Sequence, residues 1–143
     1  MKIHLATDHA GFAHKEAVKK YLADIYEVMD HGAFIYDGAD DYPDFIRPCA
    51  EAVAIDSESR GIIFGHSGQG ESMVANRTTG IRAAVYYGGS QEILTLSREH
   101  NDANILSLGT HFISEQDAID AVTLWLATTF SQDERHIRRL AKL

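Results

Sequence analysis

The chain has 143 residues, of which 45% are hydrophobic and 24% charged, and its net charge at pH 7 is −8. This length is enough for one domain with its own core, so we expect residues 1–143 to form a single domain. The acidic balance argues against a nucleic-acid-binding protein, and no apolar run approaches the roughly 18 residues of a membrane span. A single cysteine, Cys49, excludes a disulfide framework and is typical of the reducing cytoplasm, where we expect the protein to act.

Short apolar runs alternate with longer amphipathic segments, without repeats or linkers. Strand–helix alternation of this kind implies right-handed crossovers and a parallel sheet with helices on both faces. We therefore predict an α/β, Rossmann-like doubly wound sheet of five strands in the order 2-1-3-4-5. In chain order, we expect a strand at 2–8, a helix at 13–25, a strand at 26–32, a helix at 42–59, a strand at 60–65, a helix at 70–80, a strand at 81–88, a helix at 90–101, a strand at 103–109, and helices at 114–130 and 133–143.

In such a sheet, ligands bind at the carboxyl edge between strands 1 and 3, so the segments after these two strands should carry the site. The first strand is followed by "TDHAG" and the third by "GHSGQGE". The glycines of residues 65–70 lead from a strand into a helix, where backbone N–H groups and the helix N-terminus can cradle an anion. The alternative is a tight turn that needs glycine for its backbone alone.

This glycine-rich stretch is close to two known motifs and completes neither. A nucleotide-binding phosphate loop has a lysine where this chain has Glu71, and a serine-hydrolase elbow has its second glycine where this chain has Gln69. A carboxylate in a first helical turn is stabilised by the helix dipole, which is the simplest explanation of Glu71. The same placement puts a base beside the anion cradle, which suits proton abstraction next to a carbonyl with the loop stabilising an enediolate.

Asp8 and His9 end the first strand and add a second acid/base pair across the crevice, although Asp-His at a strand end can also be only a turn signal. With no His-x-x-x-His pair and no cysteine cluster, we expect no metal site. A flavodoxin-like or receiver-like binding module is the competing class. A flavodoxin needs a Ser/Thr-rich loop after strand 1, and a receiver needs an aspartate at the end of strand 3, where this chain has Gly65.

His100 and Asn101 end a predicted helix just before strand 5, at the amino edge of the sheet. The glycine loop lies at the opposite edge, about 15 Å away for a five-residue strand. His100 therefore either caps its own helix or reaches the site of a second subunit. Arg135 and Arg139 share a face of the last helix and pose the same choice, between complementing the helix dipole and clamping a phosphate bound by a neighbour.

Taken together, the motifs resemble those of the ribose-5-phosphate isomerase type B family, which also includes galactose and allose 6-phosphate isomerases. The resemblance covers essentially the whole chain and implies a metal-free aldose–ketose isomerase that needs no cofactor. It also implies a homodimer, in some members a tetramer, with active sites shared between subunits and the C-terminal helix reaching the partner. The matching segments are "DHAGF", "DYPDF", "GHSGQGESMVANR", "GIRAAV", "SREHNDANILSLG" and "RHIRRL".

The resemblance also implies roles for individual residues. In one subgroup the base is a cysteine at the end of strand 3, where this chain has Gly65; in the other it is a glutamate, which Glu71 matches. Glu71 would then move a proton between C1 and C2, while Ser67 and the Gly68–Gly70 amides hold the enediolate oxygens. The remaining roles would be ring opening by His100 with Asp8, orientation of the open chain by Asn101, phosphate binding by His9, Arg135 and Arg139, and lining of the pocket by Tyr42.

Two residues depart from the family pattern. His66 replaces the small residue usual before the serine, and His111 stands where the family supplies another phosphate-binding arginine. A neutral imidazole at position 111 would bind a phosphate more weakly than an arginine. The two departures therefore affect the identity of the substrate more than the type of reaction. We expect ribose 5-phosphate and ribulose 5-phosphate to be interconverted; the alternatives are an allose or galactose 6-phosphate isomerase, or a non-catalytic module that binds a sugar phosphate.

Overall fold

The expected strands and helices are all present, most of them shorter than predicted. A computed structural model describes all 143 residues, and none of its helices has the length and apolar character needed to cross a membrane. The strands are β1 Lys2–Thr7, β2 Glu27–Asp30, β3 Arg60–Gly65, β4 Ala83–Tyr86 and β5 Ile105–Gly109. The helices are α1 Phe12–Leu22, α2 Pro43–Ala54, α3 Gln69–Ala75, α4 Glu92–Glu99, α5 Glu115–Ala127 and α6 Glu134–Leu140, with a 3-10 turn, η1, at His9–Gly11.

The sheet is parallel throughout, but the predicted strand order was wrong. The order is β2-β1-β3-β5-β4, so β5 and not β4 lies next to β3. β5 is buried along its whole length. Most of β4 is only half-buried, because it lies at the edge of the sheet with a neighbour on one side only. One contact that fixes β5 beside β3 is polar, because the Ser107 hydroxyl of β5 donates a hydrogen bond to the carbonyl of Gly68, just beyond β3, at 2.7 Å.

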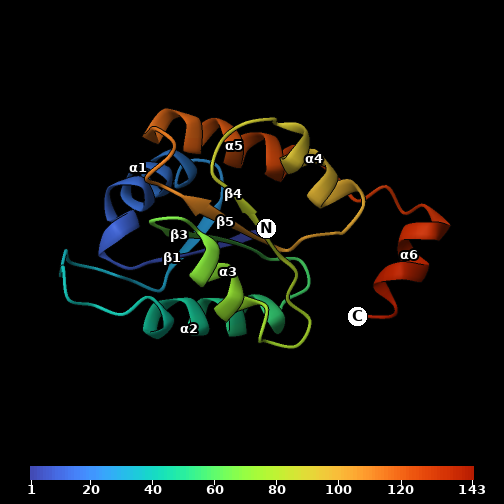
Figure 1. Cartoon of the computed structure of the whole chain (residues 1–143), viewed down its shortest axis with the longest axis horizontal. Coiled ribbons are helices and arrows are strands. Elements are labelled where there is room, and N and C mark those ends of the chain that lie inside the picture. The colour runs from blue at the N-terminus through green and yellow to red at the C-terminus, as the bar shows by residue number, and fades with distance from the viewer.

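Helices cover both faces of the sheet, as predicted (Figure 1). α1, α4 and α5 lie on one face, and α2 and α3 lie on the other. Successive side chains of a strand point to opposite faces, so each strand contributes to two cores. The larger core includes Leu5, Phe64 and Leu108 of the strands with Val18, Leu94 and Trp125 of the helices, and the smaller one includes Ala6, Ile63 and Ile105 with Ile46, Val53 and Ala75.

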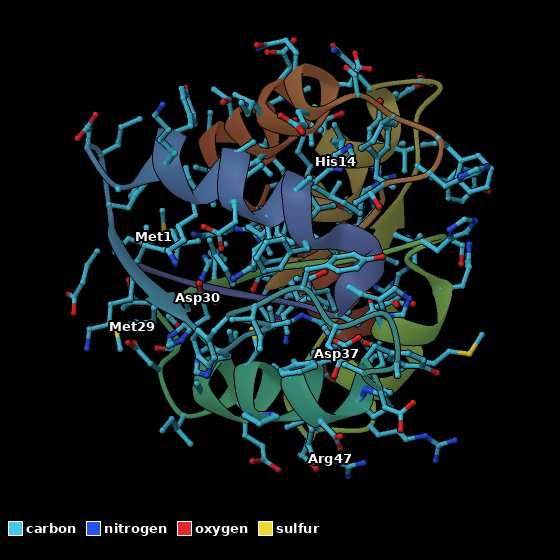
Figure 2. All side chains as sticks on the ribbon, turned by 90° about the vertical axis from the view of Figure 1, so that its left-hand side faces the viewer. Met1, His14, Met29, Asp30, Asp37 and Arg47 are labelled. Carbon is cyan, nitrogen blue, oxygen red and sulfur yellow. The ribbon has the colours of Figure 1, made fainter.

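A buried ion pair fastens α1 to the end of β2. The side chain of Lys15 is fully buried, and its Nζ donates to both carboxylate oxygens of Asp30, at 2.9 and 2.7 Å. Burial alone raises the pKa of Asp30, but hydrogen bonds from Lys15, Lys19 and the Gly32 amide outweigh it and lower that pKa. Figure 2 looks onto this end of the molecule, with Asp30 labelled, and also labels Asp37 on the loop that leads from β2 to α2.

The C-terminal helix α6 stands apart from the layered body (Figure 1). Of its residues only His136 is buried, while Ile137 is 50% exposed and the terminal Leu143 is 88% exposed. Apolar side chains left open in this way mark a surface on which another molecule can pack.

Candidate active site

The segments that follow β1, β3 and β5 meet at the carboxyl edge of the sheet. The register pairs Thr7 with Phe64 and Gly65 with Gly109, so the three strands end side by side. Thr110 joins the three segments, because its amide and hydroxyl both donate to the Gly65 carbonyl and the hydroxyl also lies 3.1 Å from the Ala10 carbonyl. The sequence predicted the meeting of the first two segments and missed the third, because the predicted order placed β5 at the far edge.

The glycines of the loop after β3 are required by close packing. Gly68 caps the start of α3 in the left-handed conformation, at φ 75°, which glycine adopts without strain. A Cβ on Gly70 would lie 2.8 Å from the hydroxyl oxygen of Tyr42, so Tyr42 stands directly against the first turn of α3. Ser67 is half-buried beside them, its hydroxyl oxygen accepting a long hydrogen bond of 3.3 Å from the Gln69 amide.

Glu71 is buried in the first turn of α3, and only 5% of its surface is exposed. Its carboxylate lies over the α-carbon of Gly65, where a Cβ would come within 2.0 Å of the Glu71 Cδ and Oε1 atoms. Burial raises the pKa of Glu71; a hydrogen bond from its own amide opposes the shift, and the charge of Asp8 adds to it. A buried carboxylate with a raised pKa is a candidate for a group that takes up and returns a proton.

Asp8 and His9 lie at the start of η1 and form a cluster with Asp40, a residue that the sequence did not single out. Asp8 caps η1 by accepting a hydrogen bond of 2.9 Å from the Ala10 amide. His9 Nδ1 lies 2.6 Å from Asp40 Oδ1 and 3.9 Å from Asp8 Oδ2. The three side chains offer ligand atoms within 4.8 Å of one another, close enough for a metal ion, but the His9 and Asp40 atoms are already hydrogen-bonded to each other.

The two residues that depart from the family pattern form a single feature. The rings of His66 and His111 are stacked, with centroids 4.2 Å apart and planes 20° apart. The β3–β5 pairing continues past the strand ends, and the His111 amide donates to the His66 carbonyl, which brings the two side chains together. Phe112 packs edge-on against both rings and contacts Tyr87, so an aromatic wall borders the glycine loop.

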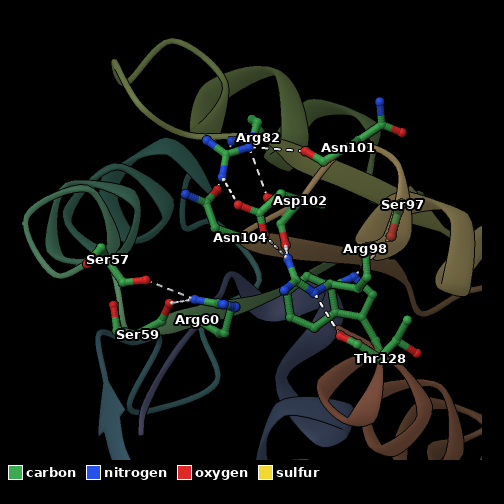
Figure 3. Close-up of polar contacts among 12 residues, drawn as sticks. Ser57, Ser59, Arg60, Arg82, Ser97, Arg98, Asn101, Asp102, Asn104 and Thr128 are labelled. Carbon is green, nitrogen blue, oxygen red and sulfur yellow. Dashed lines mark hydrogen bonds and ion pairs between the residues drawn. The ribbon is translucent and has the colours of Figure 1, made fainter. Parts of the chain in front are cut away.

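His100 and Asn101 do not join this site. They lie on the turn between α4 and β5, at the amino edge of the sheet. Figure 3 shows how the turn is held: Asp102 accepts hydrogen bonds from Arg82 and Arg98, at 3.0 and 2.9 Å. Arg82 also donates from Nε to the Asn101 carbonyl at 3.1 Å. The turn is therefore rigid, and it presents His100 and Asn101 at a distance of about one strand length, roughly 15 Å, from Glu71.

Arg135 and Arg139 are also outside the site, on the exposed surface of α6. The nearest partner of Arg135 is Asp133 at 3.9 Å, between two exposed side chains. His136, on the same helix, is buried against His100, with ring centroids 4.2 Å apart. A cavity of about 820 Å³ opens at this amino edge, and its lining includes Asn101, Arg77, Arg82, Leu140 and Leu143.

The structure therefore divides the predicted site residues into two groups. Those brought together at the carboxyl edge are Asp8, His9, Tyr42, Ser67, Gly68, Gly70, Glu71 and His111, and those left at the amino edge or on α6 are His100, Asn101, Arg135 and Arg139.

Proteins similar to this chain in sequence and in fold include sugar-phosphate isomerases. Residues 3–143 match the family described as Ribose/Galactose Isomerase. The ribose-5-phosphate isomerase B of Mycolicibacterium paratuberculosis is 37% identical over 141 residues, covering 98% of this chain and 87% of the relative. A crystal structure of the Mycoplasma genitalium ribose-5-phosphate isomerase B with bound ribulose-5-phosphate has a TM-score of 0.92 and 34% identity, covering 99% of this chain and 92% of that one. The Clostridium thermocellum enzyme gives a TM-score of 0.91 and 41% identity, with 99% and 94% covered.

Proposed function

This chain belongs to the ribose/galactose isomerase family, and we propose that a single isomerase domain spanning residues 1–143 interconverts ribose 5-phosphate and ribulose 5-phosphate. The relatives above are ribose-5-phosphate isomerases B, and one of them is seen with ribulose-5-phosphate bound. Within this chain, the observation that carries the reaction type is the buried Glu71 carboxylate beside the glycine loop. The enzyme opens the sugar ring and then moves one proton through an enediolate.

Glu71 is the base of the proposed proton transfer. It removes the proton from C2 of the open-chain aldose and returns it to C1, while the proton of the C2 hydroxyl passes to the C1 oxygen, so the aldehyde becomes an alcohol and the C2 alcohol becomes the ketone. Its burial raises its pKa, which makes it a stronger base than an exposed glutamate and so better able to take the proton from carbon. The Ser67 hydroxyl and the amides of Gly68–Gly70 stabilise the enediolate oxygens, because fixed donors aimed at a developing charge need no rearrangement during the reaction.

The position of Gly65 supports the assignment of Glu71 as the base. The cysteine-base subgroup carries its base at the end of strand 3, and in this chain a Cβ at residue 65 would lie 2.0 Å from the Glu71 carboxylate, so a side chain there would need the space that this carboxylate fills. One pocket can hold either the cysteine or the glutamate, and this chain has the glycine that makes room for the glutamate.

The remaining residues complete the site in a homodimer, in which His100 and Asn101 come from a second subunit. A rigid turn about 15 Å from Glu71 cannot serve the site of its own chain. Apolar side chains exposed on α6 and at the C-terminal residue, Ile137 and Leu143, support the packing of a second copy there. His100 of one chain then assists ring opening with Asp8 of the other, and Asn101 orients the open chain. The phosphate is bound by His9 and His111 together with Arg135 and Arg139 of the second copy, with Tyr42 lining the pocket; two such dimers would make the tetramer found in some relatives.

Turnover without metal tests the reaction and the substrate. Purified protein treated with EDTA is given ribose 5-phosphate, allose 6-phosphate and galactose 6-phosphate, and ketose formation is followed for each. We expect turnover of ribose 5-phosphate. Turnover of a hexose phosphate alone would identify a hexose phosphate as the substrate. If none of the three sugar phosphates were converted, the proposal of an isomerase would be wrong. Glu71→Gln should abolish turnover and leave substrate binding nearly intact, because the amide keeps the shape and loses the base.

Mixing two inactive variants tests the shared site. His100→Ala and Glu71→Gln each damage a different part of every composite site. When the two are unfolded, mixed and refolded together, half of the sites in a mixed dimer carry both defects and half carry neither. We expect activity to return to about one quarter of the wild-type value, since half of the dimers are mixed and each has one intact site. No recovery, with both variants folded, would place all residues of a site in one chain.

A further inference from the structure

Asp40 is the closest charged partner of His9 and has no part in the function described so far. It lies at the end of the loop between β2 and α2, where its amide donates to the Asp37 carbonyl at 3.1 Å and closes a turn. One oxygen, Oδ1, accepts two hydrogen bonds from His9, from the amide at 3.0 Å and from Nδ1 at 2.6 Å. The Asp40 side chain is 10% exposed, whereas that of His9 is 32% exposed.

We propose that Asp40 is a positioning residue that holds His9 as an imidazolium, with Nε2–H free to donate to the phosphate of the substrate. This inference rests on the proposed function, in which His9 binds the phosphate, and adds to it the group that determines the charge and orientation of His9. Phosphate recognition by this histidine is then switched by pH, unlike recognition by an arginine, which stays charged at all accessible pH values.

The hydrogen bond from Nδ1 determines what Nε2 can do. A carboxylate only accepts hydrogen bonds, so Nδ1 must carry its proton. In the neutral ring Nε2 is then a bare acceptor, which repels a phosphate oxygen. In the charged ring Nε2 is a donor and the ring carries a positive charge, so binding changes from unfavourable to favourable with a single proton.

The charged groups around His9 all favour the protonated form of its ring. The hydrogen bond to Asp40 raises the pKa of His9 and outweighs the opposing effect of burial, and the charges of Asp8, Asp40 and Asp37 add to the increase. The edge of Tyr36 faces the ring at a centroid distance of 6.2 Å, and on the α3 side Glu71 lies near Asp8. Because the pKa of His9 is raised above about 6.5, the cation is fully present below that pH and is lost as pH rises through the raised value.

The test separates the charge of Asp40 from its shape. Asp40→Asn keeps an oxygen that can accept from Nδ1 but removes the negative charge. Asp37→Asn is the matched control, because it removes a more distant charge. It keeps an oxygen that can accept the hydrogen bond that the Ala39 amide donates to Asp37 at 3.0 Å. KM and kcat for ribose 5-phosphate are measured from pH 6 to pH 9 for wild type and both variants, and the ring protons of His9 are titrated by NMR in the free proteins, with His9→Gln identifying the signal.

We expect the His9 titration midpoint of the wild type to lie above about 6.5 and to fall toward that value in Asp40→Asn, with a much smaller change in Asp37→Asn. The rise of KM with pH should move to lower pH by the same amount, so that at pH 8 KM increases about three- to tenfold while kcat changes little. The second ionisation of the phosphate is common to all three proteins and cancels in the comparison.

The two parts of the test fail in different ways. A His9 midpoint at or below about 6.5 in the wild type, or one that Asp40→Asn leaves in place, would overturn the role of Asp40 without any assay of turnover. A shifted midpoint with an unchanged pH dependence of KM would mean that the pair does not contact the phosphate, and would overturn it as well. Absence of turnover in the wild type would instead count against the isomerase, because the NMR titration does not depend on it.

Discussion

Replacing Gly65 by alanine should disable the site while leaving the fold intact. The added Cβ would lie 2.0 Å from both Cδ and Oε1 of Glu71, and 2.5 Å from Oε2. Since carbon atoms in contact are separated by about 3.5 Å, the carboxylate must move by roughly 1.5 Å. A displacement of about 1 Å of a reacting group costs on the order of a hundredfold in rate, or about 2.7 kcal/mol of transition-state stabilisation. We therefore expect kcat for ribose 5-phosphate to fall at least a hundredfold.

The stability of this variant can be compared with that of a glycine at the other end of the same strand. Overpacking costs about 1–3 kcal/mol, less than the 5–15 kcal/mol typical of a folded domain, so Gly65→Ala should remain folded in thermal melts followed by circular dichroism. Gly61→Ala is the control, because its Cβ would meet Ile105 at 2.8 Å and Val53 at 3.2 Å, away from Glu71. Gly61→Ala should lower the melting temperature and keep kcat. Wild-type kcat in Gly65→Ala would refute the placement of Glu71 as the base.

Three further outcomes follow from the same geometry. Because burial raises the pKa of Glu71 and the base must be ionised, kcat/KM should fall on acidification with a midpoint above about 4.3, and a midpoint at or below this value would contradict the desolvated base. Asp30→Ala leaves Lys15 buried without its main partner and should cost about 3 kcal/mol in urea unfolding, whereas Lys19→Ala, at a side chain 38% exposed, should cost less than about 1 kcal/mol; equal costs would count against the buried pair. His111→Arg supplies a permanent cation that can still stack on His66, so KM at pH 8 should fall about threefold or more relative to wild type, and an unchanged KM would place the phosphate elsewhere.

The sequence predicted that the segments after β1 and β3 meet, but not that the segment after β5 joins them. Alternation of strands and helices implies a parallel sheet, and a parallel sheet implies that the segments after β1 and β3 meet, which places Asp8 and Glu71 together. No local pattern says which of two apolar strands lies inside the sheet. That choice depends on contacts such as the one between Ser107 and Gly68, 39 residues apart, which no periodicity contains.

The same limitation explains which contacts between site residues were missed. The stack of His66 on His111 follows from the β3–β5 register, so the predicted order kept these two rings apart. Asp40 lies on a loop with no periodic pattern, and only the folded turn that begins at Asp37 directs it to His9. The predicted position of His100 did not depend on the strand order. In a parallel sheet, a residue that precedes β5 lies at the amino edge and a residue that follows β3 lies at the carboxyl edge, whichever strands are neighbours.

The strand order also bears on the proposed sharing of the site between two chains. With β5 beside β3, three segments meet at the carboxyl edge, and the stacked rings of His66 and His111 lie on one side of them. The same order moves β4 to the edge of the sheet, where it is half-buried, next to the α4–β5 turn that Asp102 holds in place. A cavity, an unpaired strand edge and a detached helix α6 then lie together at one end of the molecule. The chain thus has the residues proposed for proton transfer at one edge and, at the other, the residues proposed to complete the same site in a second copy.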